Sequence, residues 1–260
     1  MSREVYNYIL LFFFSSFLGW LMEVVCKLIQ FRRFINRGFL LGPYCPIYGF
    51  GAVLVTLMLS RYADAPLTVF ILAMVVCGVL EYLTSYLMEK LFHARWWDYS
   101  QKKFNLNGRV CADTLIPFGL LGLVMVYFIK PLLFGWFGHL SEGWLHGLSW
   151  GLVTLFVADV ILSVGVLSKI RGTAENVKGD STEAITKSVR EALASKSWIS
   201  RRPLHAFPEA RVYNQELRAR LKARAKEHRE AARARKEAFH AELEAAEKRI
   251  KDEINARKHG

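Results

Sequence analysis

Residues 5–29 read VYNYILLFFFSSFLGWLMEVVCKLI, an apolar run interrupted by a single acid and a single base. Residues 67–92 and 144–167 form two further runs that are mostly apolar. Each run is longer than the roughly 20 residues with which an α-helix crosses the core of a bilayer. The three runs therefore predict transmembrane helices, and they exclude a soluble enzyme.

Two weaker apolar segments, at about residues 46–61 and 114–134, raise the predicted number of transmembrane helices to about five. Helix-breaking residues interrupt both, because one segment opens at Pro46 and the other contains Pro117. Backbone groups released by such breaks must bond to neighbouring helices or to water in a cavity, since lipid offers no hydrogen bonds. The predicted fold class is an all-α, polytopic membrane protein.

The distribution of basic residues predicts the orientation in the membrane. The segments at the end of and after the runs 5–29 and 67–92 hold nine Lys and Arg residues, whereas the opposite side holds three, Arg3, Arg61 and Lys130. Short loops rich in Lys and Arg stay in the cytoplasm. We therefore expect a plasma-membrane protein with its N-terminus outside and its C-terminus in the cytoplasm. The first run is too long for a signal-peptide core, so it is expected to be retained.

Acidic residues within the predicted spans mark a candidate site. An ionisable group at the bilayer centre costs roughly 2.5–3.5 kcal/mol on insertion scales, so such residues face a protein interior or water. Glu81, Ser85 and Glu89 recur every four residues, which places them on one face of a helix. Asp159 stands alone in the last run, and we expect it to form hydrogen bonds between helices rather than to belong to the site.

Basic residues and helix N-termini are predicted to meet these acids at the cytoplasmic face. The second and fourth spans both begin there, close to Arg37 and Arg109. Arginines and free amide groups suit an anion, while the acids suit a cation or a proton. The candidate substrate-binding residues are Glu23, Arg37, Tyr44, Glu81, Ser85, Glu89, Trp97, Asp98, Asn107 and Arg109. The alternative is that the acids form structural ion pairs with Arg37, Arg95 and Arg109.

The sequence lacks the common catalytic and cofactor motifs. It contains no G-x-x-x-x-G-K-[ST] phosphate loop and no H-E-x-x-H. The four cysteines form no C-x-x-C pair, so neither a disulfide framework nor a metal site is expected. No catalytic residue and no cofactor is predicted, and the interpretation favours a protein that is not an enzyme.

Four blocks of sequence carry a resemblance to a known family. They are NRGFLLGPYCPIYG at 36–49, EYLTSYLME at 81–89, WDYS at 97–100 and NLNG at 105–108. Over roughly residues 8–168 the chain resembles the bacterial ABC-transporter type IV (CmpB-like) membrane permease family. The resemblance implies a polytopic transport protein. Because the chain has no nucleotide-binding motif, it also implies an ATPase subunit in trans and a homo-oligomer that completes the pathway.

The first two pairs of helices also suggest an internal duplication. Asn36 precedes Pro46 by ten residues, as Asn107 precedes Pro117. Chance similarity between apolar hairpins is the alternative.

Three parts are predicted: a transmembrane domain at 1–168, an amphipathic linker at 169–207 and a basic cytoplasmic helix at 208–260. In the linker, Ile185, Val189 and Leu193 recur every four residues, which suits either a helix on the membrane surface or a plain linker. The long helix carries apolar residues at 4-3-4 spacing, Phe239, Leu243, Ala246 and Ile250, enough for a short coiled coil. A solvated single helix or a partner contact are the alternatives.

Residues 169–260 hold 23 bases against 14 acids. This charge suits anionic membrane lipid. Nucleic acid is not favoured as a partner, because no aromatic residues that could stack on nucleobases are interleaved with the Lys and Arg residues.

Three functions remain open from the sequence. The first is a permease component that binds a small polar or anionic solute in a cytoplasm-facing cavity. The second is an integral-membrane enzyme that acts on a lipid headgroup or another phosphate-bearing amphiphile at the inner leaflet, with Asp98 or Glu89 as general base. The third is a non-catalytic scaffold whose tail recruits a partner.

Overall fold

A computed structural model describes residues 2–177, 181–194, 198–207 and 210–214, and parts of the stretch 216–239. The chain divides into two compact units, Met1–Tyr213 and Asn214–Gly260. The first unit contains all the elements discussed below.

The described residues are mainly helical, which confirms the predicted fold class. The helices are α1 (Arg3–Phe31), α2 (Pro46–Leu59), α3 (Pro66–Phe92), α4 (Ala112–Val124), α5 (Lys130–Gly138), α6 (Glu142–Asn176), α7 (Thr182–Ala194) and α8 (Trp198–Ala206). A 3-10 turn, η1 (Ser60–Tyr62), follows α2, and a π-helical segment, η2 (Met125–Ile129), joins α4 to α5. Two short antiparallel pairs complete the structure, β1 (Ala94–Arg95) with β4 (Arg211–Val212) and β2 (Asn105–Leu106) with β3 (Val110–Cys111).

Within the described part, four helical stretches are long and apolar enough to cross a membrane: Arg3–Phe31, Pro66–Phe92, Ala112–Gly138 and Glu142–Asn176. The second of the five predicted spans corresponds to α2, which has 14 residues. At 1.5 Å per residue it extends about 21 Å, which is less than the roughly 30 Å of a bilayer core. We therefore describe α2 as a short helix within the bundle of longer ones.

The loop before α2 enters the bundle and so covers part of the membrane thickness that α2 is too short to span. The backbone N–H groups of Leu41 and Gly42 donate hydrogen bonds to Asp159 Oδ1 and Oδ2, at 2.8 and 2.7 Å. Asp159 lies midway along α6. Irregular backbone is tolerated at membrane depth only where its polar groups are satisfied by protein or by a wet cavity. Asp159 thus bonds to a loop, where a bond between helices was expected.

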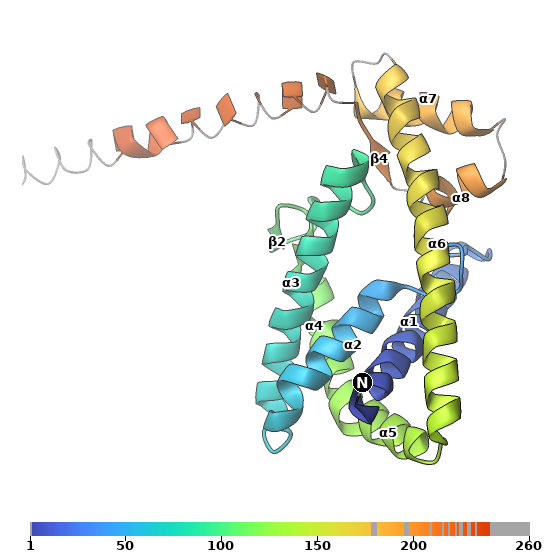
Figure 1. The fold of residues 1–260 in the computed structure, drawn as a ribbon. Coiled ribbons are helices and arrows are strands. Elements are labelled where there is room, and N and C mark those ends of the chain that lie inside the picture. The colour runs from blue at the N-terminus through green and yellow to red at the C-terminus, as the bar shows by residue number, and fades with distance from the viewer. Residues whose placement is uncertain are drawn as a thin grey trace, which may run out of the picture. The chain divides into compact units, whose positions relative to one another are not determined.

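Side-chain contacts define two ends of the first unit. At one end, Arg3 pairs with Glu142 and donates a hydrogen bond to the Leu140 carbonyl oxygen, so the N-terminus lies beside the start of α6. At the other end, the loop after α1, the loop after α3 and the segment after α6 come together, and Tyr213 N donates to the His93 carbonyl oxygen. Figure 1 shows α6 running between these two ends.

Glycines allow the helices of each hairpin to approach closely. A Cβ added at Gly49 in α2 would lie 2.6 Å from the Phe12 carbonyl oxygen of α1, and one at Gly122 in α4 would lie 2.2 Å from the Ala73 Cβ of α3. Small residues serve this purpose in membrane helices. Pro117 lies inside α4, and the regular helix gives way only at η2. The two prolines therefore differ in position: Pro117 lies inside a helix, whereas Pro46 is the first residue of one, α2.

The predicted amphipathic linker folds onto the protein. Ile185, Val189 and Leu193 of α7 are almost completely buried, and Thr186 Oγ1 bonds to the backbone of Val212. The apolar face of α7 therefore packs on the first unit and is not free to lie in lipid. Phe239 is exposed, whereas Leu243, Ala246 and Ile250 lie outside the described residues, so the coiled coil stays a prediction.

Candidate functional site

A cavity of about 680 Å³ lies within the first unit. Residues of α1, α2, α3, α4 and α6 line it, and most of them are apolar. The charged residues of the lining are Glu23, Arg37 and Glu81. The cavity is therefore more apolar than the polar cavity that the sequence suggested.

Glu23 and Arg37 form one polar corner of this cavity. Arg37 Nε donates to Glu23 Oε2 at 3.3 Å, and the Tyr48 hydroxyl donates to Glu23 Oε1 at 2.8 Å. Arg37 Nη1 also donates to the Ala206 carbonyl oxygen at 2.7 Å, and its guanidinium lies 4.4 Å from the centre of the Phe207 ring. The charge of Arg37 is thus balanced by Glu23, and its Nε and Nη1 both donate to protein acceptors.

Glu81 forms the second polar corner and has a different environment. Its side chain is buried in α3, where Tyr99 OH and Thr114 Oγ1 donate to its two oxygens at 3.3 and 3.2 Å. Thr114 also lies 2.9 Å from the Cys111 carbonyl oxygen, and its single hydroxyl proton can serve only one of the two acceptors. Among the described residues no Lys, Arg or His pairs with Glu81.

Tyr99 remains a hydrogen-bond donor in this position. Burial raises the pKa of the Tyr99 phenol, and the charge of the neighbouring Glu81 raises it further. The phenol therefore stays protonated at neutral pH and continues to donate to Glu81.

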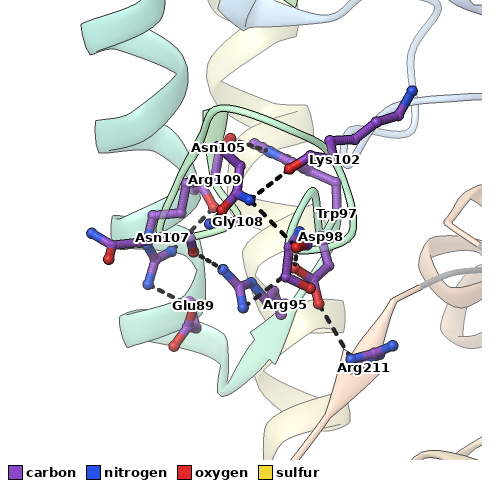
Figure 2. A network of polar contacts seen from close by, with 12 residues as sticks. Glu89, Arg95, Trp97, Asp98, Lys102, Asn105, Asn107, Gly108, Arg109 and Arg211 are labelled. Carbon is purple, nitrogen blue, oxygen red and sulfur yellow. Dashed lines mark hydrogen bonds and ion pairs between the residues drawn. The ribbon is translucent and has the colours of Figure 1, made fainter. Parts of the chain in front are cut away.

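A third polar cluster lies beside the cavity, and of its members only Trp97 belongs to the lining. Arg109 Nη2 donates to Glu89 Oε2 at 2.7 Å and Nη1 donates to Ser85 Oγ at 3.1 Å, as part of the network in Figure 2. Trp97 Nε1 donates to the Arg109 carbonyl oxygen at 3.2 Å. Both charged side chains are largely buried, at 11% and 19% exposure. This cluster ties the loop after α3 to the last turns of that helix.

Asp98 and Asn107 hold the same loop in shape. Asp98 pairs with Arg95 and with Arg211, at 3.5 and 3.2 Å (Figure 2). Asn107 and Gly108 have positive φ angles of 54° and 65°, the conformation of a tight hairpin turn between β2 and β3. Asn-Gly is the usual sequence for such a turn, so these positions have a structural explanation.

Tyr44 is similarly engaged away from the cavity lining. Its hydroxyl donates to Asp159 Oδ2 at 2.5 Å, next to the bonds from Leu41 and Gly42. The Ser163 hydroxyl donates to Asp159 Oδ1 at 2.8 Å. Asp159 therefore accepts four hydrogen bonds and fixes the loop before α2.

The structure brings four of the ten predicted site residues to the cavity, Glu23, Arg37, Glu81 and Trp97. The other six, Tyr44, Ser85, Glu89, Asp98, Asn107 and Arg109, lie in the clusters around it. Their role in substrate binding stays a prediction. Lining residues that were not in the predicted set include Tyr48, Tyr99 and Phe207. Tyr48 and Tyr99 fall within conspicuous sequence blocks, whereas nothing in the sequence around Phe207 pointed to a cavity.

These long apolar helices around a cavity define a polytopic membrane protein. The chain belongs to the family described as "Putative ABC-transporter type IV", whose model matches residues 10–164. It is thus a membrane transport component, as its sequence blocks suggested. No curated protein and no solved structure matches the chain significantly.

Proposed function

We propose that the protein is a permease component whose cavity binds an amphipathic molecule with a cationic head, placed against Glu81. The N-terminus lies outside the cell, the C-terminus lies in the cytoplasm, and an ATPase subunit acts in trans. The permease works as a homo-oligomer, because four spanning stretches and the short α2 are few for a complete pathway. The coarse function rests on the family, and the substrate chemistry rests on the cavity.

The observation that carries the substrate class is the environment of Glu81. It is a buried carboxylate in the wall of a mostly apolar cavity, and it accepts two long hydrogen bonds where an ionised carboxylate offers about four acceptor sites. A buried charge without a partner is costly. A ligand with a positive head and an apolar body would supply the missing charge and fill the apolar remainder.

An anionic solute has less support from the geometry. Arg37 is paired with Glu23 and bonded to Ala206, and Arg109 is paired with Glu89 outside the cavity. An anion would have to displace a carboxylate from one of these arginines. Counted over Glu23, Arg37 and Glu81, the charged groups of the lining sum to one negative charge when all are ionised.

The enzymatic alternative has less support for a related reason. Its proposed general bases were Asp98 and Glu89, and both are ion-paired and absent from the cavity lining. A general base must reach the proton that it removes. The scaffold alternative depends on the tail, most of which lies outside the described residues.

The test uses a pair of probes that differ in charge and share their shape, tetraphenylphosphonium and tetraphenylborate. Binding is measured by equilibrium dialysis against the full-length protein in nanodiscs, with empty nanodiscs subtracted. We expect the cation to bind more tightly than the anion. Glu81→Gln should weaken cation binding about tenfold, which corresponds to about 1.4 kcal/mol.

Glu89→Gln is the matched control, because it removes the same charge from the same helix outside the cavity. It should leave cation binding within about twofold of the original value. Preferential binding of tetraphenylborate, or equal affinity of the Glu81→Gln variant for the cation, would refute the proposed substrate class.

A further inference from the structure

The chain beyond the matched family region contributes a side chain to the cavity. Phe207, which follows α8, is part of the lining and is 7% exposed. Its ring stacks on Phe39 with centroids 4.5 Å apart and meets Trp96 edge-on at 5.5 Å. The family match ends at residue 164, so this aromatic plug comes from outside it.

Polar contacts hold α8 and Phe207 in this position. Arg37, itself in the lining, donates to the Ala206 carbonyl oxygen. From α7, Arg190 donates to the carbonyl oxygens of Leu204 and Phe207, at 2.8 and 3.3 Å. The docked segment is therefore coupled to Glu23 through Arg37.

Arg202 of α8 is inconsistent with a permanently docked segment. It is 4% exposed, and its three guanidinium nitrogens are buried without any hydrogen-bond partner. The charge of Asp159 acts on Arg202, but the oxygens of Asp159 already accept four hydrogen bonds and do not pair with it. Burial lowers the pKa of this guanidinium. A buried, unpaired guanidinium destabilises the docked position, because undocking would let its N–H groups regain hydrogen-bond acceptors.

We propose that α8 and Phe207 form a lid over the cavity, and that an anionic phospholipid headgroup opens the lid by binding Arg202. The lid regulates access to the cavity of the proposed permease. This proposal rests on the proposed function only for the identity of the ligand in the cavity. Guanidinium groups bind phosphate through two parallel hydrogen bonds, which suits a lipid phosphodiester. The lid lies at the end of the first unit where the basic loops meet, and basic residues at that position attract anionic lipid.

The test measures access to the cavity without any transported ligand. Cys77 lines the cavity from α3, and a variant that retains it as its single cysteine reports on closure. The full-length protein is placed in nanodiscs of phosphatidylcholine, or of phosphatidylcholine mixed with phosphatidylglycerol. The rate of Cys77 modification by a charged methanethiosulfonate reagent is then followed. We expect modification to be about tenfold faster in the anionic nanodiscs.

Two variants test the roles of Phe207, which closes the cavity, and Arg202, which binds the headgroup, one at a time. Phe207→Ala should give fast modification in both lipids, because the plug is gone. Arg202→Leu should give slow modification in both, because the lid no longer carries an unpaired charge. Lys169→Leu removes one charge from an exposed position of α6 and should retain the response to phosphatidylglycerol.

Four results would overturn the proposal. Equal rates in the original protein and in Phe207→Ala, both in phosphatidylcholine nanodiscs, would show that Phe207 does not close the cavity. A lipid response that survives in Arg202→Leu, or that disappears in Lys169→Leu, would remove Arg202 from the mechanism. Acceleration by inorganic phosphate in pure phosphatidylcholine nanodiscs would identify a soluble anion as the opening ligand. Cation binding at Glu81 is a separate readout, so its failure is distinguishable from these results.

Discussion

Asp159 and Glu81 are both acids within long apolar helices, but their surroundings differ. Asp159 accepts four hydrogen bonds, two of them from backbone N–H groups of the loop before α2. Glu81 accepts two long bonds from hydroxyl groups and lines the cavity. Asp159 thus accepts hydrogen bonds from backbone N–H groups that lipid cannot satisfy, whereas Glu81 retains acceptor sites for a ligand. The difference assigns a structural role to Asp159.

Asp159→Ala should destabilise the protein markedly, because it leaves the Leu41 and Gly42 N–H groups without an acceptor. Each unpaired buried donor costs about 1–3 kcal/mol. Tyr44→Phe removes one donor and leaves the backbone bonds intact, so it should cost only about 1 kcal/mol. Thermal denaturation in detergent, followed by tryptophan fluorescence, measures both. A loss no larger in Asp159→Ala than in Tyr44→Phe would contradict the structural role.

The two helical hairpins depend on close approach at glycines. In the pair formed by α3 and α4, Gly122 faces Ala73 and Gly119 faces Phe70. In the pair formed by α1 and α2, Gly49 faces Phe12. Membrane helices lack a strong hydrophobic drive to associate, so contacts that small residues permit contribute much of their packing. The hairpins therefore resemble each other in packing, although Pro46 and Pro117 occupy different positions in their helices.

Gly122→Ala should separate α3 from α4, since its new Cβ would lie 2.2 Å from that of Ala73. Overpacking of this kind costs about 1–3 kcal/mol. Gly135→Ala is the matched control, because no atom lies within 4 Å of a Cβ at that position of α5. It should leave stability unchanged, or raise it by up to about 1 kcal/mol through the higher helix propensity of alanine. The same denaturation assay compares the two variants, and equal stability would refute the close contact.

The first unit has two different ends, and this makes its orientation testable. Arg3, Glu142 and the end of α5 meet at one end, while the loops after α1 and α3 meet α8 at the other. From the distribution of basic residues we expect the second end to lie in the cytoplasm. The N-terminus and α8 are thus expected on opposite sides of the membrane.

Cysteines introduced one at a time at His139 and Lys103, in a cysteine-free background, test this orientation. Both positions are exposed and lie in loops at opposite ends of the unit. A membrane-impermeant maleimide should label His139→Cys in intact cells and Lys103→Cys only after permeabilisation. The reverse pattern would invert the proposed orientation, and labelling of both in intact cells would contradict the opposite placement of the two loops.

The sequence alone identified the membrane class, four of the helices and the family, because hydropathy and motif blocks are local properties of the chain. It also predicted the acids and arginines that pair, although not which pairs line a cavity. Asp159 illustrates the limit, since its acceptor role depends on Leu41 and Gly42, more than a hundred residues away. The short strands were also missed, since two-residue pairs leave no periodicity.

Sequence composition determined that this chain enters a membrane, since about 20 apolar residues in a row have no stable place in water. It also determined the basic character of the loops and of the tail. Only the tertiary structure decided that Glu81 borders the cavity while Glu89 does not, although both lie on one helix face. It likewise decided that the Phe207 ring contacts the guanidinium of Arg37, although 170 residues separate the two in the sequence. Such contacts depend on how helices and loops pack in three dimensions, and distance along the chain does not reveal them.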